Sequence, residues 1–279
     1  MRSAVTMDAP LAEGSARTLD AYKLTRITDG DTPFVEMPIR MLSIDTPELH
    51  YPGTTKPSAH DAGLAKLGRA LLAGKHPQLP KRLATYLGRR LDEHAGTRHM
   101  QQGVRSMAEY QRMLSERLPT PSGRGTRKLF ARSSDQIFEA RGRLLAYLSP
   151  MYSAEEREGM SLHDRRTFNL QLVEEGWAAP FVIYPSLAKP EDMALFRAAA
   201  HRARTERRGH YRDRKTLTGY EFRFCVKLLR GERELPERSC ADLSTGRLYP
   251  PAEYLRVKPE DRMFVWPRDL RRAQAALSA

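Results

Sequence analysis

Residues 27–48 read ITDGDTPFVEMPIRMLSIDTPE, and this stretch decides both the fold and the chemistry that the sequence predicts. It contains two acidic tetrapeptides, DGDT at residues 29–32 and DTPE at residues 45–48. The apolar run IRMLSI at residues 39–44 lies between them and predicts a strand with one charged side chain, Arg40. Side chains alternate between the two faces of a strand, so the even-numbered positions of this run are expected to share a face.

Three carboxylates, those of Asp31, Asp45 and Glu48, are expected to converge if a short antiparallel pairing brings the two tetrapeptides together. Carboxylates that lie close together resist ionisation unless a cation joins them. A hard divalent ion such as Ca²⁺ accepts carboxylate, carbonyl and water oxygens, and arginine offers a planar fork that matches two oxygens of a phosphate. A cation, a spare carboxylate and the guanidinium of Arg40 are together the groups needed to hydrolyse a phosphodiester.

Each tetrapeptide also has a purely structural interpretation. Asp-Gly is a common hairpin-turn pair, and Asp-Thr-Pro-Glu is a common start of a loop or helix. Single motif matches often arise by chance. The functional interpretation therefore depends on the ordered pair of tetrapeptides and on the arginine-bearing strand between them.

These residues resemble the pattern of the staphylococcal nuclease (thermonuclease) family. In that family a DGDT turn is followed by a strand whose arginine lies five residues before a DTPE segment, and a Gly-Arg pair later opens another strand. Here Arg40 precedes Asp45 by five residues (45 − 40), and Gly142 and Arg143 open the run GRLLAYL. FNLQLVEEGWA at residues 168–178 is similar to a family helix that ends in glycine. The resemblance covers roughly residues 18–58 and 124–212.

The resemblance implies an α+β fold in which an OB-like five-stranded β-barrel is surrounded by helices. It also implies a Ca²⁺-dependent nuclease that hydrolyses phosphodiester bonds of DNA, RNA or both. Such enzymes prefer single-stranded or flexible substrate and leave 3′-phosphates. Other divalent cations are possible in place of Ca²⁺.

The family roles transfer to the matching positions of this chain. Glu48 is expected to be the general base that takes a proton from the attacking water. Arg40 and Arg143 are expected to bind the scissile phosphate and to stabilise the charge that develops on it. The expected ligands of the ion are the side chains of Asp31 and Asp45 and the backbone carbonyl of Thr46.

Two further positions are candidates for substrate binding. Arg141 stands where the family often has a tyrosine before the Gly-Arg pair, and it either replaces that tyrosine with a charge or faces water. Tyr184 ends the short apolar run FVIY, near a place where the family has active-site tyrosines.

The chain is expected to have three parts. A leader occupies residues 1–17, and a nuclease-like domain follows at residues 18–216, with an insertion at about residues 75–123. The insertion either packs on the core as a helical hairpin or forms an arm that contacts substrate or a protein partner, because it carries many basic side chains. A C-terminal extension occupies residues 217–279.

Apolar residues recur at helical or strand spacing along the rest of the chain. Helices are expected at about residues 58–73, 81–94, 101–117, 168–175 and 190–208, and strands at residues 19–27, 127–133 and 143–148.

The C-terminal extension is expected to be small and β-rich. Residues 219–240 alternate like a hairpin, and RMFVW at residues 262–266 predicts another strand before a helix at residues 269–277. About sixty residues are too few to bury much surface alone, so the extension is expected to pack on the nuclease-like body. Three roles stay open for it: contact with substrate, binding of a protein partner, or completion of the core.

Composition narrows the class of protein. The chain has 279 residues with a net charge of +13, which favours a polyanionic partner such as DNA or RNA. Two cysteines, Cys225 and Cys240, do not make a disulfide framework or a zinc motif, and are expected to be reduced thiols. The sequence shows no signal peptide and no apolar run long enough for a membrane span, so a cytoplasmic location is expected.

Two alternatives to a free-standing nuclease remain. A nuclease-like fold can persist as a nucleic-acid-binding module with little or no catalysis, although in this chain the acids and arginines of the pattern are present. An effector nuclease confined to one context would use the insertion or the C-terminal extension as a docking surface for a protein partner.

Overall fold

The protein is described here from a computed structural model, which covers residues 22–139, 141–232 and 235–278. The expected leader at residues 1–17 and the start of the first expected strand lie outside these residues. The helices are α1 (Asp61–Leu72), α2 (Lys81–Gly88), α3 (Ala95–Arg117), α4 (Ala154–Glu158), α5 (Phe168–Glu174), α6 (Pro190–Thr205), α7 (Gly219–Leu229) and α8 (Leu270–Ser278). The strands are β1 (Lys23–Ile27), β2 (Pro33–Glu36), β3 (Ile39–Met41), β4 (Ile44–Asp45), β5 (Leu129–Arg132), β6 (Leu144–Pro150), β7 (Ala179–Pro180), β8 (Val182–Ile183), β9 (Ser239–Asp242), β10 (Leu248–Tyr249) and β11 (Arg262–Val265).

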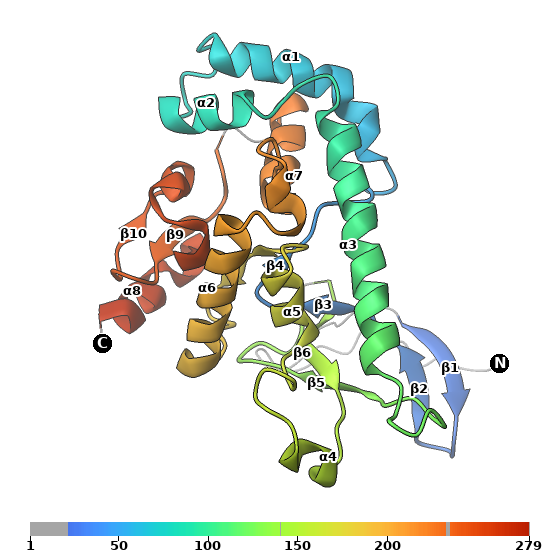
Figure 1. The fold of residues 1–279 in the computed structure, drawn as a ribbon. Helices are drawn as coiled ribbons and strands as arrows, with labels where there is room; N and C mark the ends of the chain where they lie inside the picture. The colour runs from blue at the N-terminus through green and yellow to red at the C-terminus, as the bar shows by residue number, and fades with distance from the viewer. Residues whose placement is uncertain (1–21, 140, 233–234, 279) are drawn as a thin grey trace, which may run out of the picture.

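The fold is α+β, with its strands divided among small sheets (Figure 1). β1 and β2 form an antiparallel hairpin, β3 pairs in parallel with β6, and β5 pairs antiparallel with β6. β4 pairs with β7, and the order β10-β9-β11-β8 makes the largest sheet. Within the described ranges these sheets do not close into a barrel, so the five-stranded OB-like barrel is not confirmed.

The strand expected at residues 39–44 is broken in the middle. Ser43 has a φ of 62°, a left-handed conformation that turns the chain from β3 into β4. The buried amide of Asn169 supports the break, because its nitrogen donates to the Leu42 carbonyl at 2.9 Å and its oxygen accepts from the Leu148 amide at 2.9 Å. The expected alternation over six residues therefore does not hold, and Asp45 belongs to a different sheet from Arg40.

Two hydrophobic clusters hold the elements together. The first joins α1 and α2 to α7 and includes Leu64, Leu87 and Phe222, which are fully buried. The second joins β6, α5 and α6 and includes Ala146, Phe168 and Ala200. In the first cluster, helices of the insertion and of the C-terminal extension share one core, so both segments pack on the body of the protein (Figure 1).

Several expected elements are confirmed. The expected helices at residues 58–73, 81–94, 101–117, 168–175 and 190–208 correspond to α1, α2, α3, α5 and α6, and the strands at residues 127–133, 143–148 and 262–266 correspond to β5, β6 and β11.

The C-terminal extension differs from the expectation. Residues 219–229 form helix α7 and not a strand, and the extension has helices of 11 and 9 residues against strands of 4, 2 and 4 residues. The apolar residues of α7 are buried on most sides of the helix. Their spacing therefore fits the two-residue period of a strand as well as the 3.6-residue period of a helix. A capping box, in which the hydroxyl of Thr218 accepts from the amide of Glu221 and the Glu221 carboxylate accepts from the Thr218 amide, fixes the helix start.

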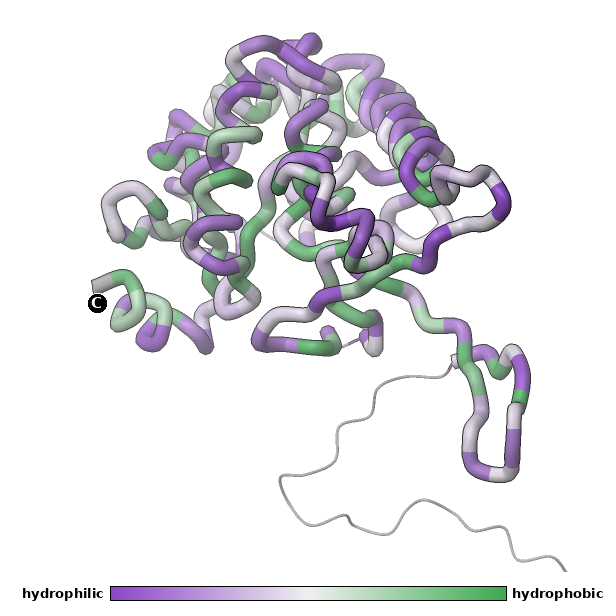
Figure 2. The backbone as a smooth tube through the Cα atoms, turned by 60° about the horizontal axis from the view of Figure 1, so that its bottom comes forward, coloured by the Kyte–Doolittle hydropathy of each residue, from purple (hydrophilic) through white to green (hydrophobic). Residues whose placement is uncertain are grey.

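The β1–β2 hairpin stands apart from the rest of the chain (Figure 2). Every residue in both of its strands is exposed. The register places Leu24 opposite Val35 and Ile27 opposite Pro33, so one face of the hairpin is apolar. None of the described helices is both long enough and apolar enough to cross a membrane.

Candidate active site

Asp45 lies at the centre of a buried charge cluster. Its side chain is 1% exposed, at the end of β4. The carboxylate accepts from the Tyr220 backbone amide at 2.7 Å and from the Arg40 guanidinium at 3.1 Å. It is also paired with Arg223 at 3.1 Å. A buried carboxylate with this many donors is fixed in position.

Arg223 of α7 joins the two carboxylates of the DTPE segment. Two of its nitrogens contact both oxygens of Asp45, at 3.3 and 3.1 Å, and one of them also donates to Glu48. Burial acts to lower the pKa of Arg223, but the charges of Asp45 and Glu48 outweigh it and raise that pKa. Arg223 is therefore a permanent cation between the two acids.

The DTPE segment is held between two helices that approach it closely. At Gly219, the first residue of α7, a Cβ would lie 2.5 Å from an Asp45 carboxylate oxygen and 2.6 Å from the Thr46 carbonyl. At Gly103 in α3, a Cβ would lie 2.8 Å from the Pro47 carbonyl. Only glycine allows both approaches without displacement of the backbone.

His99 of α3 fixes the backbone at Glu48. Its Nε2 accepts the Glu48 amide proton at 2.9 Å, and its ring stacks on Phe222 at 4.0 Å between centroids. Burial lowers the pKa of His99 to about 3. The ring is therefore neutral near pH 7, as an acceptor at Nε2 must be.

The members of the cluster differ in their exposure to solvent, and therefore in what they can contact. Asp45 is sealed, whereas the side chains of Glu48 and Arg40 are 27% and 30% exposed. A water molecule or a phosphate can therefore reach Glu48 and Arg40 but not Asp45. This arrangement makes Asp45 the anchor of the cluster and leaves Glu48 and Arg40 for contact with a substrate.

Arg143 immediately precedes the neighbouring strand, β6. Arg40 is opposite Leu145 in the parallel β3–β6 pair, and Arg143 comes two residues before Leu145. The Arg143 side chain is 38% exposed and is held by Glu139, with a nitrogen–oxygen distance of 3.0 Å. Both guanidinium groups are thus partly open to solvent.

Asp31 is not part of this cluster. It lies in the exposed turn between β1 and β2, where it accepts from the hydroxyl of Thr32 at 3.1 Å. In the described part of the chain no hydrogen bond or ion pair joins it to Asp45 or Glu48, and Figure 2 shows its hairpin extending from the body. The short pairing that the sequence suggested between the two tetrapeptides is replaced by the pairing of β4 with β7.

The two substrate-binding candidates have different surroundings. Arg141 is exposed at the turn before β6. Tyr184 is half-buried, packs against the second hydrophobic cluster, and donates its backbone amide to the Phe264 carbonyl at 2.9 Å.

The described arrangement does not fit a calcium ion. Ca²⁺ takes six to eight oxygen ligands. Over the described ranges, no group of three or more His, Cys, Asp or Glu side chains could hold a metal. Asp45 and Glu48 are both neutralised by Arg223, and the Thr46 carbonyl faces Gly219. The Arg223 guanidinium thus lies between the two carboxylates for which the sequence predicted a metal ion.

No sequence motif indicated the residues that complete the cluster, Arg223 and His99. Arg223 contacts Asp45 across 178 positions, and His99 contacts Glu48 across 51. The Thr218-to-Glu221 capping box was a signal for the start of α7, but no local pattern indicates what a helix packs against. No protein-family model and no curated protein matches the chain.

Proposed function

We propose that this protein is a nuclease that hydrolyses phosphodiester bonds of DNA or RNA at the face carrying Glu48, Arg40 and Arg143. The observation that carries the proposal is the difference in exposure between Asp45 and the charged side chains around it. This sealed carboxylate holds Arg40 and Arg223 in place, while Glu48 and Arg40 keep part of their surface open to solvent. A base and a phosphate-binding cation thus belong to one charge cluster, and each is partly open to solvent.

Glu48 takes a proton from a water molecule, and the water oxygen attacks the phosphorus. The bond from phosphorus to the leaving oxygen breaks, and that oxygen takes up a proton from solvent. Arg40 and Arg143 bind the non-bridging oxygens and stabilise the charge that grows on them. A positioned base contributes about 10²–10⁴-fold, and one charge-stabilising donor about 10²–10³-fold.

The proposal includes a closed form of the protein, in which the β1–β2 hairpin packs against β5. The hairpin exposes Leu24, Ile27 and Val35 by 53%, 64% and 44%, and Leu129 and Phe130 of β5 are each 44% exposed. Exposed apolar faces of this kind favour packing against each other. Such packing would complete the OB-like barrel and carry Asp31 toward the DTPE segment. Dependence of activity on Ca²⁺ or another divalent cation tests that closed form.

A binding module without hydrolysis is the second candidate. The observation in its favour is Arg223, which already neutralises both acids of the DTPE segment. A carboxylate paired with a guanidinium is a weaker base than a free one. The net charge of +13 supports a polyanionic partner under either candidate.

The test is incubation with labelled single- and double-stranded DNA and RNA, in Ca²⁺ or in chelator, with analysis of product ends. The parent is expected to cleave and to leave 3′-phosphates, preferentially on single strands. Glu48→Gln is expected to lose cleavage and keep binding, while Glu253→Gln, which alters an acid paired with Arg256 elsewhere on the surface, matches the parent. Binding by the parent without cleavage of any substrate supports the second candidate instead.

A further inference from the structure

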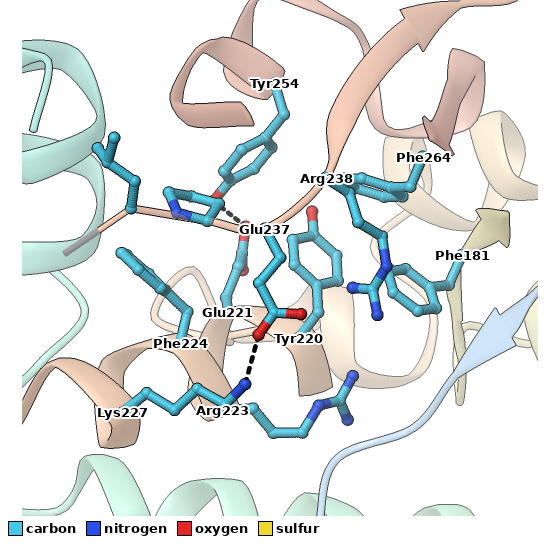
Figure 3. A pocket seen from close by; sticks show the side chains of 12 residues that line it. Phe181, Tyr220, Glu221, Arg223, Phe224, Lys227, Glu237, Arg238, Tyr254 and Phe264 are labelled. Atoms are coloured by element: carbon cyan, nitrogen blue, oxygen red, sulfur yellow. Dashed lines mark hydrogen bonds and ion pairs between the residues drawn. The ribbon is translucent and has the colours of Figure 1, made fainter. Parts of the chain in front are cut away.

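A cavity lies beside the charge cluster, and Arg223 is one of the residues that line it (Figure 3). It is open to solvent at its mouth, and aromatic and charged side chains line it. Phe181, Tyr220 and Phe264 form an aromatic wall, with ring centroids 4.9 to 5.1 Å apart. The rest of the lining includes three cations, two acids and further apolar side chains, so the cavity combines apolar surface with charged groups.

Among the described residues that line this cavity, Arg238 is the cation for which no ion pair is seen. Its guanidinium lies 3.8 Å above the Trp266 ring and 5.5 Å from the Phe181 ring. Its Nε is buried and has no hydrogen-bond partner. Burial lowers the pKa of Arg238 to about 10, and the nearby cation Arg223 acts in the same direction, against the attraction of Glu237. A buried donor without an acceptor costs stability, and a bound anion would remove that cost.

The other charged groups of the cavity are already matched. Lys227 is paired with Glu237 at 2.6 Å, a contact marked in Figure 3. Arg223 is paired with both acids of the DTPE segment. Glu221 accepts from the Tyr254 hydroxyl at 3.1 Å and from the Thr218 amide at 2.9 Å. Among the described lining residues, Arg238 is therefore the charged group for which neither an ion pair nor a hydrogen bond is seen.

We propose that this cavity binds a nucleotide unit, with a phosphate at Arg238 and the base on the aromatic wall. Arginine binds phosphate oxygens through its planar fork, and bases stack on aromatic rings with little dependence on sequence. An uncharged apolar ligand would leave Arg238 without a partner, and inorganic phosphate alone would leave the aromatic wall uncovered. The nucleotide can be free or part of a strand, because both present the same phosphate and base.

The cavity and the charge cluster share Arg223, which lines the first and pairs with Asp45 in the second. A nucleotide held here would place the next phosphate of a strand toward Glu48 and Arg40. This positioning role rests on the proposed nuclease function, but binding of the nucleotide does not.

Tryptophan fluorescence tests the proposal on the full chain. The two tryptophans are Trp177 and Trp266, and Arg238 contacts the ring of Trp266, so ligand at Arg238 is expected to change its emission. The probes are AMP, adenosine, inorganic phosphate and a short single-stranded oligonucleotide. AMP is expected to bind about tenfold or more tightly than adenosine or phosphate, because only AMP supplies both groups. Equal affinity for phosphate and AMP would overturn the base-stacking half of the proposal.

Arg238→Met is expected to weaken AMP binding by about tenfold or more, and Arg238→Lys to keep part of it, because lysine retains the charge without the fork. Arg256→Met, at an exposed arginine paired with Glu253, is the matched control and keeps parental affinity. Unchanged thermal midpoints exclude misfolding as the cause. AMP binding by Arg238→Met equal to that of the parent contradicts the site.

The outcome separates this proposal from the nuclease function. Binding of AMP that depends on Arg238, in a parent that cleaves nothing, supports the nucleotide site and contradicts the nuclease. Cleavage by a parent that does not bind AMP supports the nuclease function and contradicts the nucleotide site. The oligonucleotide distinguishes the source: tighter binding than AMP indicates a strand, and weaker binding indicates a free nucleotide.

Discussion

Arg223 and Asp45 form a forked ion pair, with nitrogen–oxygen distances of 3.3 and 3.1 Å, although 178 positions separate them in the chain. The pair ties the C-terminal extension to the DTPE segment. The Tyr220 amide at the start of α7 donates to the same carboxylate. The extension therefore completes the candidate active site and is not an appendage to it.

Loss of this ion pair is expected to destabilise the fold. Arg223→Met leaves a sealed carboxylate with Arg40 and the Tyr220 amide as its remaining partners, and is expected to lower the free energy of unfolding by about 1.5–3 kcal/mol. Urea denaturation measures this difference. Arg256→Met, whose partner Glu253 lies at the surface, is expected to cost less than about 0.5 kcal/mol. Equal costs in the two variants would show that the buried pair contributes nothing special.

The close approach of α7 makes a second prediction. In Gly219→Ala the new methyl group meets the Asp45 carboxylate and the Thr46 carbonyl, so the helix or the DTPE segment must shift. We expect a loss of roughly 1–3 kcal/mol in the free energy of unfolding, the usual cost of overpacking. Gly159→Ala is the control, because nothing lies within 4 Å of a Cβ there and its φ is −89°. Equal unfolding midpoints for Gly219→Ala and Gly159→Ala in a denaturant series would show that the close approach at Gly219 does not constrain the fold.

Stability is expected to fall in acid because two buried histidines must stay neutral. Burial lowers the pKa of His99 to about 3 and of His210 to about 4, below the ordinary value near 6.5. The unfolded chain therefore binds more protons than the folded one between about pH 6.5 and pH 4. Each histidine contributes a loss of up to about 1.4 kcal/mol per pH unit as the pH falls through that window, and none above it.

Urea denaturation at a series of pH values from 7.5 to 4 checks this dependence. His99→Gln is expected to flatten the slope, whereas His50→Gln, at an exposed site, keeps the parental slope. A parental slope in His99→Gln would show that the acid sensitivity arises elsewhere.

Both arginines near the β3–β6 pair, Arg40 and Arg143, are expected to matter for turnover. Arg40→Ala and Arg143→Ala should each lower the cleavage rate by about 10²-fold or more, because each removes one group that stabilises charge on the phosphate. Arg40→Ala is also expected to lower stability, since Arg40 contacts the buried Asp45, while Arg143 pairs with the nearby Glu139. An Arg143→Ala variant that cleaves slowly but keeps the parental free energy of unfolding would show that Arg143 acts in catalysis and not in folding.

Helices of the insertion could be predicted because their evidence is local. Apolar residues at helical spacing predicted α2 and α3, and both are present. The first residues of α7 carry apolar groups that fit a strand as well as a helix, and burial on most sides removed the polar face that distinguishes the two. The capping box at Thr218 was the local signal that favoured a helix.

Less of the candidate site could be predicted than of the helices. Arg40 and Asp45, which match the family pattern at a spacing of five residues, lie together, with a nitrogen–oxygen distance of 3.1 Å. The left-handed turn at Ser43 was not visible in the sequence, although it separates β3 from β4. Asp31 was expected beside Asp45 but lies on the exposed hairpin, because β4 pairs with β7. Contacts such as those of Arg223 and His99 depend on packing between distant segments, which no local pattern specifies.

The most direct test of the central claim is the rate of cleavage of labelled, heat-denatured DNA by the parent and by Glu48→Gln. The assay runs under single-turnover conditions, with Ca²⁺, and the affinity of each protein for the same DNA is measured in parallel. Glu48→Gln is expected to cleave at least about 10²-fold more slowly while it binds DNA with parental affinity. Cleavage by Glu48→Gln at the parental rate, or no cleavage by the parent, would contradict the proposed nuclease function of Glu48.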